Sequence, residues 1–193
     1  MASKVGIIGG GNVGSALNRG IQRAGYASSV SDRNNVAEVA SNADVVILAV
    51  PIKALDDVVK KLGASISGKI VIDVTNTLTP EMAFDAKTTS GAEELQNKIP
   101  SSKVVKCFNT VFAQHIDTGK LNGQLLTAFA ASDDEDAKEE VLKLAKDIGF
   151  DAMNGGPLSN AKHLESLGFF NIQLGYVLGN GVNAGYRYVH QSH

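Results

Sequence analysis

The chain contains little cysteine and no large excess of charge of either sign. It has 193 residues with one cysteine, and its 18 basic and 20 acidic residues give a formal net charge of −2. The lone Cys107 excludes an internal disulfide, and its apolar surroundings predict a buried thiol in a strand, as expected in a reducing cytosol. The interspersed charges leave no basic face for nucleic acid or an anionic membrane, so we expect neither as a principal partner.

Long apolar runs and metal-ligand clusters are also missing from the sequence. The longest apolar stretch, 169–178, is too short to span a bilayer and contains Asn171 and Gln173. The chain enters its first predicted strand without a charged leader or signal-peptide core, so we expect a cytoplasmic protein. The histidines lack zinc-site spacing. The acidic run 133–136 is interpreted as the first turn of a helix with Ser132 as its N-cap, so no metal is expected.

A glycine-rich turn follows the first apolar strand and is the strongest motif in the sequence. Gly9 permits a tight turn, Gly11 lets the backbone approach a pyrophosphate, and Gly14 lets the following helix pack on the strand. The free N–H groups at the start of that helix favour an anion. Asp32 follows at roughly 20 residues, where a carboxylate would bind ribose hydroxyls. The pattern predicts a bound dinucleotide.

Alternating strands and helices predict an α/β fold, a Rossmann-type doubly wound and mostly parallel sheet. Between Ser31 and Asp44 there is room for only one short helix, 36–41, so the third strand of the usual first half is missing. The serine-rich second strand then becomes an edge, and the adenine side of the site is expected to be open. The other expected strands are 44–50, 69–74, 104–108, 125–131 and 150–152, and the expected helices are 12–24, 52–62, 92–97 and 134–148.

A glycine-containing helix is predicted near the C-terminus, over 159–178. Gly168, Gly175 and Gly179 would form one stripe along it, which permits close approach of another helix or a flat ring. Apolar residues surround this helix almost completely, which favours a homodimer interface over packing within the monomer. The expected division is a dinucleotide-binding domain at 1–153 and a substrate-capping, dimer-forming extension at 154–193.

Five motifs together resemble the NADP oxidoreductase, coenzyme F420-dependent family, which includes reductases of the deazaflavin F420 and is similar to the cytosolic domain of the STEAP metalloreductases. They are Gly9–Gly14, Leu48–Pro51, Asp73–Asn76, Phe108–Val111 and Gly156–Ala161.

The resemblance implies a division of the site into two ends. Near the dinucleotide it implies roles for Asn12 and Val13 at the pyrophosphate, Val50, Pro51 and Asn76 at the riboses, and Asn109, Thr110 and Val111 at the nicotinamide carboxamide. Beside the second ring it implies Leu158, Ser159 and Ser166.

Three positions depart from the family pattern. The F420 reductases have a histidine at the position of Asn109 and a threonine at that of Gly168, which puts the deazaflavin in doubt. The usual Ser-Arg pair for the 2′-phosphate of NADP is Asp32-Arg33 here. Arg33 suits a phosphate whereas Asp32 favours the free hydroxyls of NAD, so both cofactors stay open.

The leading functional hypothesis is an oxidoreductase that passes a hydride between NAD(P)(H) and F420, FMN or FAD. Positioning of two rings supplies most of such catalysis, so no catalytic acid or base is expected from the sequence. The alternatives are a reductase of a small imine or keto substrate and a dinucleotide-binding sensor or interaction module without chemistry.

Overall fold

The protein, described as a computed structural model over residues 3–77 and 89–190, is built around a five-stranded parallel sheet. The strand order is β2-β1-β3-β4-β5, so β2 is an edge strand and β1 pairs with both β2 and β3. This order confirms the Rossmann-type sheet and its shortened first half. The strands are β1 (Val5–Ile8), β2 (Ser28–Ser31), β3 (Val45–Leu48), β4 (Ile70–Asp73) and β5 (Lys103–Lys106).

Helices cover both faces of this sheet because its central strands are apolar on both sides. In β3, Val45 and Ile47 join the core beneath α1 and α6, whereas Val46 and Leu48 join the core beneath α2, α3 and α4. The helices are α1 (Asn12–Arg23), α2 (Val36–Ser41), α3 (Leu55–Leu62, after a 3-10 turn at Ile52–Ala54), α4 (Gly91–Lys98), α5 (Ala113–Ile116) and α6 (Glu135–Ile148).

The segment after β5 differs from the expectation of further strands in one continuous sheet. β8 (Thr127–Ala130) and β9 (Asp151–Asn154) form a separate parallel pair, joined to the main sheet by a bridge between Lys106 and Ala131. Leu125, expected in the same strand as β8, instead belongs to a hairpin of β6 (Lys120–Leu121) and β7 (Gln124–Leu125). The turn 122–123 has positive φ at both residues, which closes this hairpin.

The prediction of Ser132 as the N-cap of α6 is wrong. The Asp134 carboxylate accepts the hydrogen bond from the Ala137 amide at 2.9 Å. The Ser132 hydroxyl is buried and donates to the Val104 carbonyl oxygen at 2.7 Å. Ser132 therefore ties the loop to β5, and the acidic residue two positions later caps the helix.

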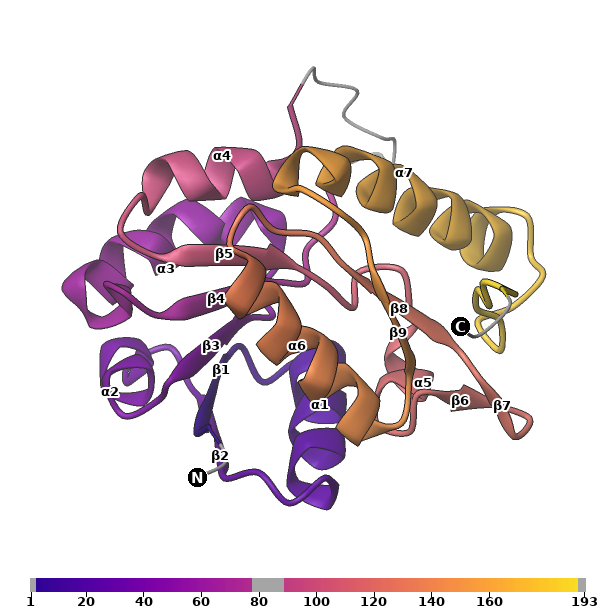
Figure 1. Ribbon diagram of the computed structural model, residues 1–193, viewed down its shortest axis with the longest axis horizontal. Coiled ribbons are helices and arrows are strands. Elements are labelled where there is room, and N and C mark those ends of the chain that lie inside the picture. Colours follow the sequence, from indigo (N-terminus) through magenta and orange to yellow (C-terminus); the bar gives the residue numbers. More distant parts are fainter. Residues whose placement is uncertain (1–2, 78–88, 191–193) are drawn as a thin grey trace.

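The C-terminal helical segment has nearly the predicted extent, but it is not one uniform α-helix. It comprises a 3-10 turn at Leu158–Asn160, α7 (Ala161–Ile172) and a π-helical turn at Gln173–Val177. Gly179 lies beyond it with φ +71°, so the predicted three-glycine stripe along one helix is wrong. Figure 1 shows α4 and α7 next to each other along the top of the molecule.

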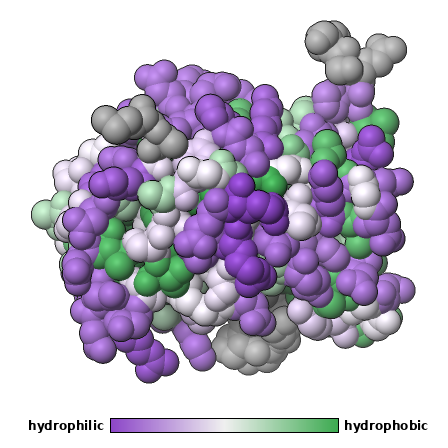
Figure 2. All heavy atoms as spheres, turned by 90° about the horizontal axis from the view of Figure 1, so that it is seen from below, coloured by the Kyte–Doolittle hydropathy of each residue, from purple (hydrophilic) through white to green (hydrophobic). Residues whose placement is uncertain are grey.

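The described helices include no candidate for a membrane span. Among residues 3–77 and 89–190, no helix combines the length and apolar character needed to cross a bilayer. The face opposite α4 and α7 is mainly hydrophilic, with apolar side chains in separate small patches (Figure 2).

Candidate active site

The glycine loop between β1 and α1 has the geometry that the sequence predicts. Gly9 has φ +113°, and a Cβ there would lie 2.4 Å from the Ala49 carbonyl oxygen. A Cβ at Gly14 would lie 1.9 Å from the Gly9 carbonyl oxygen, so the start of α1 packs directly on the loop. A Cβ at Gly11 would meet nothing within 4 Å, and α1 has no side-chain cap. The loop therefore presents open backbone to a ligand, as an anion site requires.

A cavity of about 710 Å³ lies on one side of this loop, between the end of β2 and α3. We call it the β2-side cavity. It contains six of the predicted cofactor-binding residues, and charged side chains from α3 and the turn before it also line it. Its lining is Ile8, Gly9, Gly10, Gly11, Ser31, Asp32, Arg33, Val36, Ala49, Val50, Pro51, Lys53, Ala54, Asp57, Val58 and Lys61.

Lys53, Asp57 and Lys61 were missed by the sequence analysis. They recur every fourth residue and therefore share one face of the helical stretch that starts at Ile52. That spacing was available in the sequence, but the sequence does not show that this face points toward the loop after β2.

The Asp32 carboxylate is engaged by its own loop. Its Oδ1 accepts hydrogen bonds from the amides of Asn34 at 2.6 Å and Asn35 at 3.2 Å. The Asp32 amide in turn donates to Asn35 Oδ1 at 2.9 Å. These bonds form an Asx-type turn that leads from β2 into α2. Asp32 thus lines the β2-side cavity and also has a structural role there.

A second cavity, of about 240 Å³, lies on the other side of the loop, beneath α7. We call it the α7-side cavity. It contains the predicted Asn12, Val13, Asn76, Asn109, Thr110 and Val111, together with residues that sequence reasoning missed. No charged side chain is among its described lining, which also includes Val74, Phe108, Phe112, Ala113, Gly168, Asn171, Ile172 and Tyr176.

A reciprocal asparagine pair forms the floor of the α7-side cavity. Asn109 Nδ2 donates to Asn76 Oδ1 at 2.8 Å and to the Leu164 carbonyl oxygen at 2.8 Å, and Asn76 Nδ2 donates to the Asn109 carbonyl oxygen at 3.0 Å. A Cβ at Gly168 would lie 2.6 Å from Asn76 Oδ1 and 2.8 Å from the Asn109 carbonyl oxygen. Gly168 is therefore needed for α7 to lie this close to the pair.

The wall of the same cavity is aromatic. Phe112 and Tyr176 meet edge to face, with ring centroids 5.7 Å apart. A Cβ at Gly175 would lie 2.7 Å from Phe112 Cζ, so this glycine brings the π-helical turn against the ring. The contacts of Gly168 and Gly175 lie within the chain, which corrects the expectation that the glycines serve a subunit interface.

A fully buried ion network fastens α7 to the carboxyl end of the sheet. Lys106 Nζ lies 2.9 Å from Asp73 Oδ2 and 3.0 Å from Glu165 Oε1, and it also donates to the Thr75 carbonyl oxygen at 2.5 Å. Glu165 accepts a further bond from Thr77 Oγ1 at 2.8 Å. Burial alone lowers the pKa of Lys106, but the two carboxylates outweigh it and raise the pKa above its ordinary value.

This network was also missed by the sequence analysis, although part of its signal was present. Lys106 and Asp73 each interrupt an apolar strand, and they are register partners in β4 and β5. Glu165 could not have been assigned to them because it is far away in the chain.

The predicted second-ring residues do not line either cavity. Leu158 is only 2% exposed and packs in the core beneath α2, α3 and α4. Ser159 is exposed. Ser166 is also exposed, and its hydroxyl donates to the Lys162 carbonyl oxygen of the same helix. The reason is helical phase: Leu164, Gly168 and Asn171 face inward, and Ser166 lies on the other side of α7.

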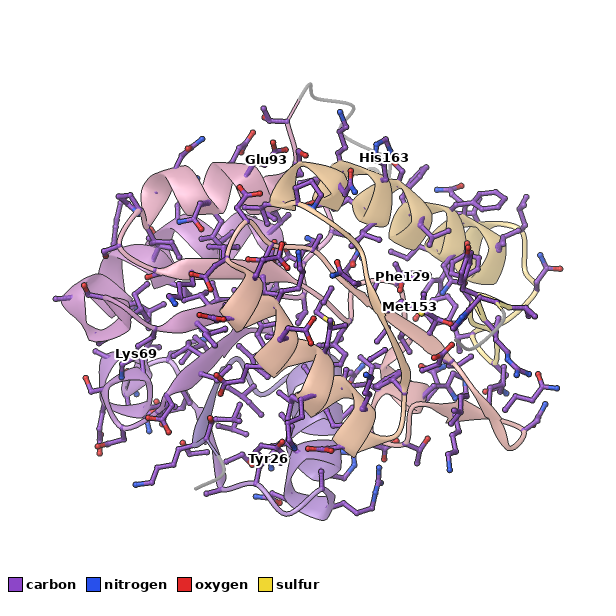
Figure 3. The ribbon with its side chains drawn as sticks, viewed as in Figure 1. Tyr26, Lys69, Glu93, Phe129, Met153 and His163 are labelled. Atoms are coloured by element: carbon purple, nitrogen blue, oxygen red, sulfur yellow. The ribbon has the colours of Figure 1, made fainter. Side chains whose placement is uncertain are left out.

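Other parts of the molecule offer weaker candidates. A cavity of about 730 Å³ lies at the amino ends of the strands, away from the glycine loop. Lys69, on its lining, points toward α2 (Figure 3), where its Nζ donates to the carbonyl oxygens of Ala40, Ser41 and Ala43. Its ammonium group therefore caps a helix end. In the part of the chain that is described, no His, Cys, Asp or Glu cluster could hold a metal ion.

Sequence comparison relates the chain to redox proteins. The sequence model described as NADP oxidoreductase coenzyme F420-dependent matches residues 32–77. Metalloreductase STEAP3 of Rattus norvegicus is 28% identical over 181 residues, which are 86% of this chain and 36% of that protein. Metalloreductase STEAP2 of Homo sapiens is 28% identical over 84% of this chain and 35% of that protein. The chain thus spans about a third of these relatives' length.

Solved structures share the fold over most of the chain. A crystal structure from Arthrobacter sp. FB24, provisionally described as an F420-dependent NADP-reductase, has TM-score 0.89 and 23% identity and covers 97% of this chain and 100% of that one. An imine reductase from Myxococcus stipitatus in complex with NAD+ has TM-score 0.66 and 16% identity, covering 93% and 63%. Together with the sequence matches, these findings support an NAD(P)-dependent oxidoreductase and confirm the predicted resemblance to the F420-dependent NADP oxidoreductase family.

Proposed function

We propose that this protein transfers a hydride between NAD(P)(H) and a flavin-like or deazaflavin carrier. The observation that carries the proposal is the pair of unlike cavities on the two sides of one glycine loop. The β2-side cavity is charged and suits the adenosine end of a dinucleotide, and the uncharged α7-side cavity suits flat rings. The open backbone at Gly11 lies between them for the pyrophosphate.

The α7-side cavity supports hydride transfer through positioning. When bound, the nicotinamide supplies or accepts a hydride at its ring, and the partner ring must lie against it. Asn76 and Asn109 use only part of their hydrogen-bonding capacity on each other, so they retain groups for a carboxamide edge. Phe112 and Tyr176 provide an aromatic wall against which a flat ring can pack. Among the described lining residues there is no carboxylate, imidazole or thiol, and proximity of the two rings is the catalytic contribution that we propose.

Anaerobic mixing tests this function. Purified protein with NADPH or NADH is combined with F420, FMN or FAD, and the absorbance of both partners is followed. Equal loss of reduced dinucleotide and oxidised carrier is expected. Tight dinucleotide binding without oxidation by any of these carriers would instead favour the sensor or interaction module. Oxidation by a cyclic imine or a keto acid alone would favour the small-substrate reductase.

The α7 segment also supports a proposed homodimer. Phe170, Tyr176, Val177 and Leu178 are all more than half exposed, at 53%, 62%, 58% and 65%. Such an exposed apolar group on one segment is typical of a subunit interface. Sedimentation at micromolar concentration is expected to show a dimer that L178S weakens, and a wild-type monomer would contradict the proposal.

The buried free thiol of Cys107 suits a reducing compartment, and we propose the cytoplasm.

A further inference from the structure

The β2-side cavity carries an excess of positive charge. Its lining includes three cationic side chains, Arg33, Lys53 and Lys61, and two carboxylates, Asp32 and Asp57. Three cationic side chains and two carboxylates give these five residues a net charge of +1. Such a cavity favours the more negative of two otherwise equal ligands.

The cations come from two elements that the fold brings together. Arg33 lies in the loop after β2, and Lys61 lies in the last turn of α3. Lys61 Nζ lies 3.4 Å from the Arg33 carbonyl oxygen, so the ammonium group reaches the loop that follows the edge strand. In a sheet of this kind the adenosine ribose is bound at the end of the second strand. Lys61 is therefore positioned at the ribose end of the cavity.

Asp32 opposes this charge less than its position suggests. Two loop amides already donate to its Oδ1. Their dipoles partly neutralise the carboxylate and hold it to the β2–α2 turn. Asp57 lies one helical turn before Lys61 on the same face of α3, so it is the other local negative charge.

We propose that Lys61, together with Arg33, makes the protein select NADP(H) over NAD(H) by binding the 2′-phosphate. The inference rests on the proposed function because it assumes that a dinucleotide occupies this cavity. The inference assigns Lys61 of α3 as a residue that determines specificity, and it favours NADP(H) over NAD(H) as the cofactor.

Equilibrium binding of NADPH and NADH to the wild type, K61Q and K60Q tests this inference. Wild type is expected to bind NADPH more tightly. K61Q is expected to raise the Kd for NADPH about five- to tenfold, the effect of losing one partly solvated charge-assisted bond, and to leave NADH nearly unchanged. Lys60 is exposed and does not line the cavity, so K60Q is the matched control and should change neither Kd. D57N should shift the ratio the opposite way, toward NADPH.

The outcomes separate the inference from the proposed function. If neither dinucleotide binds, the proposed function fails. If both bind but wild type prefers NADH, or if K61Q changes both affinities equally or neither, the selection by Lys61 is overturned and hydride transfer still stands. Adenosine 2′,5′-bisphosphate and 5′-AMP as competitors isolate this end of the site, and the preference of wild type for the bisphosphate should shrink in K61Q.

Discussion

The two cavities beside the glycine loop are built in opposite ways. The β2-side cavity is lined by residues 8–61 and carries five charged side chains. The α7-side cavity combines segments that extend from Asn12 to Tyr176 and has about a third of the volume, and its lining within residues 3–77 and 89–190 includes no charged side chain. One therefore discriminates ligands by charge, and the other discriminates them by shape and hydrogen bonding.

The difference has a consequence for mutations. In the charged β2-side cavity a single substitution changes an interaction that water partly screens, so effects on affinity are modest. Beside the α7-side cavity, Gly168 is already in close contact with the asparagine pair, and one added carbon must displace backbone or an amide. We therefore expect larger effects on the α7 side and the largest at the loop that both cavities share.

G14A should disrupt both cavities, because it distorts the glycine loop that lies between them. The added Cβ would lie 1.9 Å from the Gly9 carbonyl oxygen, which forces β1 and α1 apart. We expect a loss of more than about 4 kcal/mol of folding free energy, measured by denaturant unfolding. Dinucleotide binding should be lost at the same time.

G11A is the matched control at the same loop. A Cβ at Gly11 meets nothing within 4 Å in the free protein, so folding should be retained. Dinucleotide affinity should still fall, by about ten- to a hundredfold, because the pyrophosphate needs close approach to the backbone. Equal stability losses in G11A and G14A would contradict this account of the loop.

K106M tests whether the α7 side depends on its buried ion network. Removing the ammonium leaves Asp73 and Glu165 facing each other without compensation, at a cost of about 3–5 kcal/mol. Chemical denaturation measures the loss. In the fraction that remains folded, acceptor turnover should fall while adenosine 2′,5′-bisphosphate still binds.

K98M provides the comparison for K106M. Lys98 pairs with Asp56 on the surface, where solvent screens the interaction, so the midpoint of unfolding should not move measurably. A K106M variant as stable as K98M would show that the buried network contributes little.

G168A should sharpen the difference between the cavities. Its Cβ would lie 2.6 Å from Asn76 Oδ1, so α7 must move away from the asparagine pair. We expect a stability loss of about 1–3 kcal/mol, typical of overpacking. Hydride transfer in single-turnover experiments should slow about tenfold or more. The NADPH to NADH affinity ratio should stay at its wild-type value; a changed ratio would show that the cavities are coupled.

Near neutral pH, Cys107 is expected to give the smallest effect, and it reports how closed the region behind the α7-side cavity is. Burial raises the pKa of its thiol to about 12, so the native thiol should not react with alkylating reagents at pH 8. Because the folded pKa exceeds the unfolded one, this contribution to stability is complete below about pH 9 and is lost as pH rises toward 12. The expected slope is about 1.4 kcal/mol per pH unit. In C107A the thiol no longer titrates, so its contribution to the slope of stability against pH should disappear. Rapid alkylation of the native protein would contradict the burial of Cys107.

Local patterns made much of the fold predictable. The glycine spacing identified Gly9 and Gly14 correctly, since the positive φ of Gly9 and the contact of Gly14 with the Gly9 carbonyl oxygen are both local to the loop. The short distance from Ser31 to Asp44 correctly predicted that β2 lies at the edge. The N-cap of α6 was misassigned because Ser132 and Asp134 are both good caps, and the burial of Ser132 against β5 decided between them.

The candidate site was predictable only where its residues follow strand ends. Asn76 and Asn109 lie beside each other because β4 and β5 are parallel neighbours, so their carboxyl ends coincide. Ser166, expected near the second ring, is exposed and lines neither cavity, because the phase of a helix relative to the sheet depends on its docking. Glu165, one position earlier, proved to be the residue that anchors it.

The sequence by itself determined the parallel sheet, its missing strand and the glycine loop, because short-range periodicity and backbone freedom act between residues close in the chain. Only the tertiary structure decided how α3 and α7 face the loop. That choice brings Lys61 beside Arg33 and Gly168 against the asparagine pair. The physical reason is that packing across the sheet fixes helix phase and position, and no local pattern encodes which distant residues will meet.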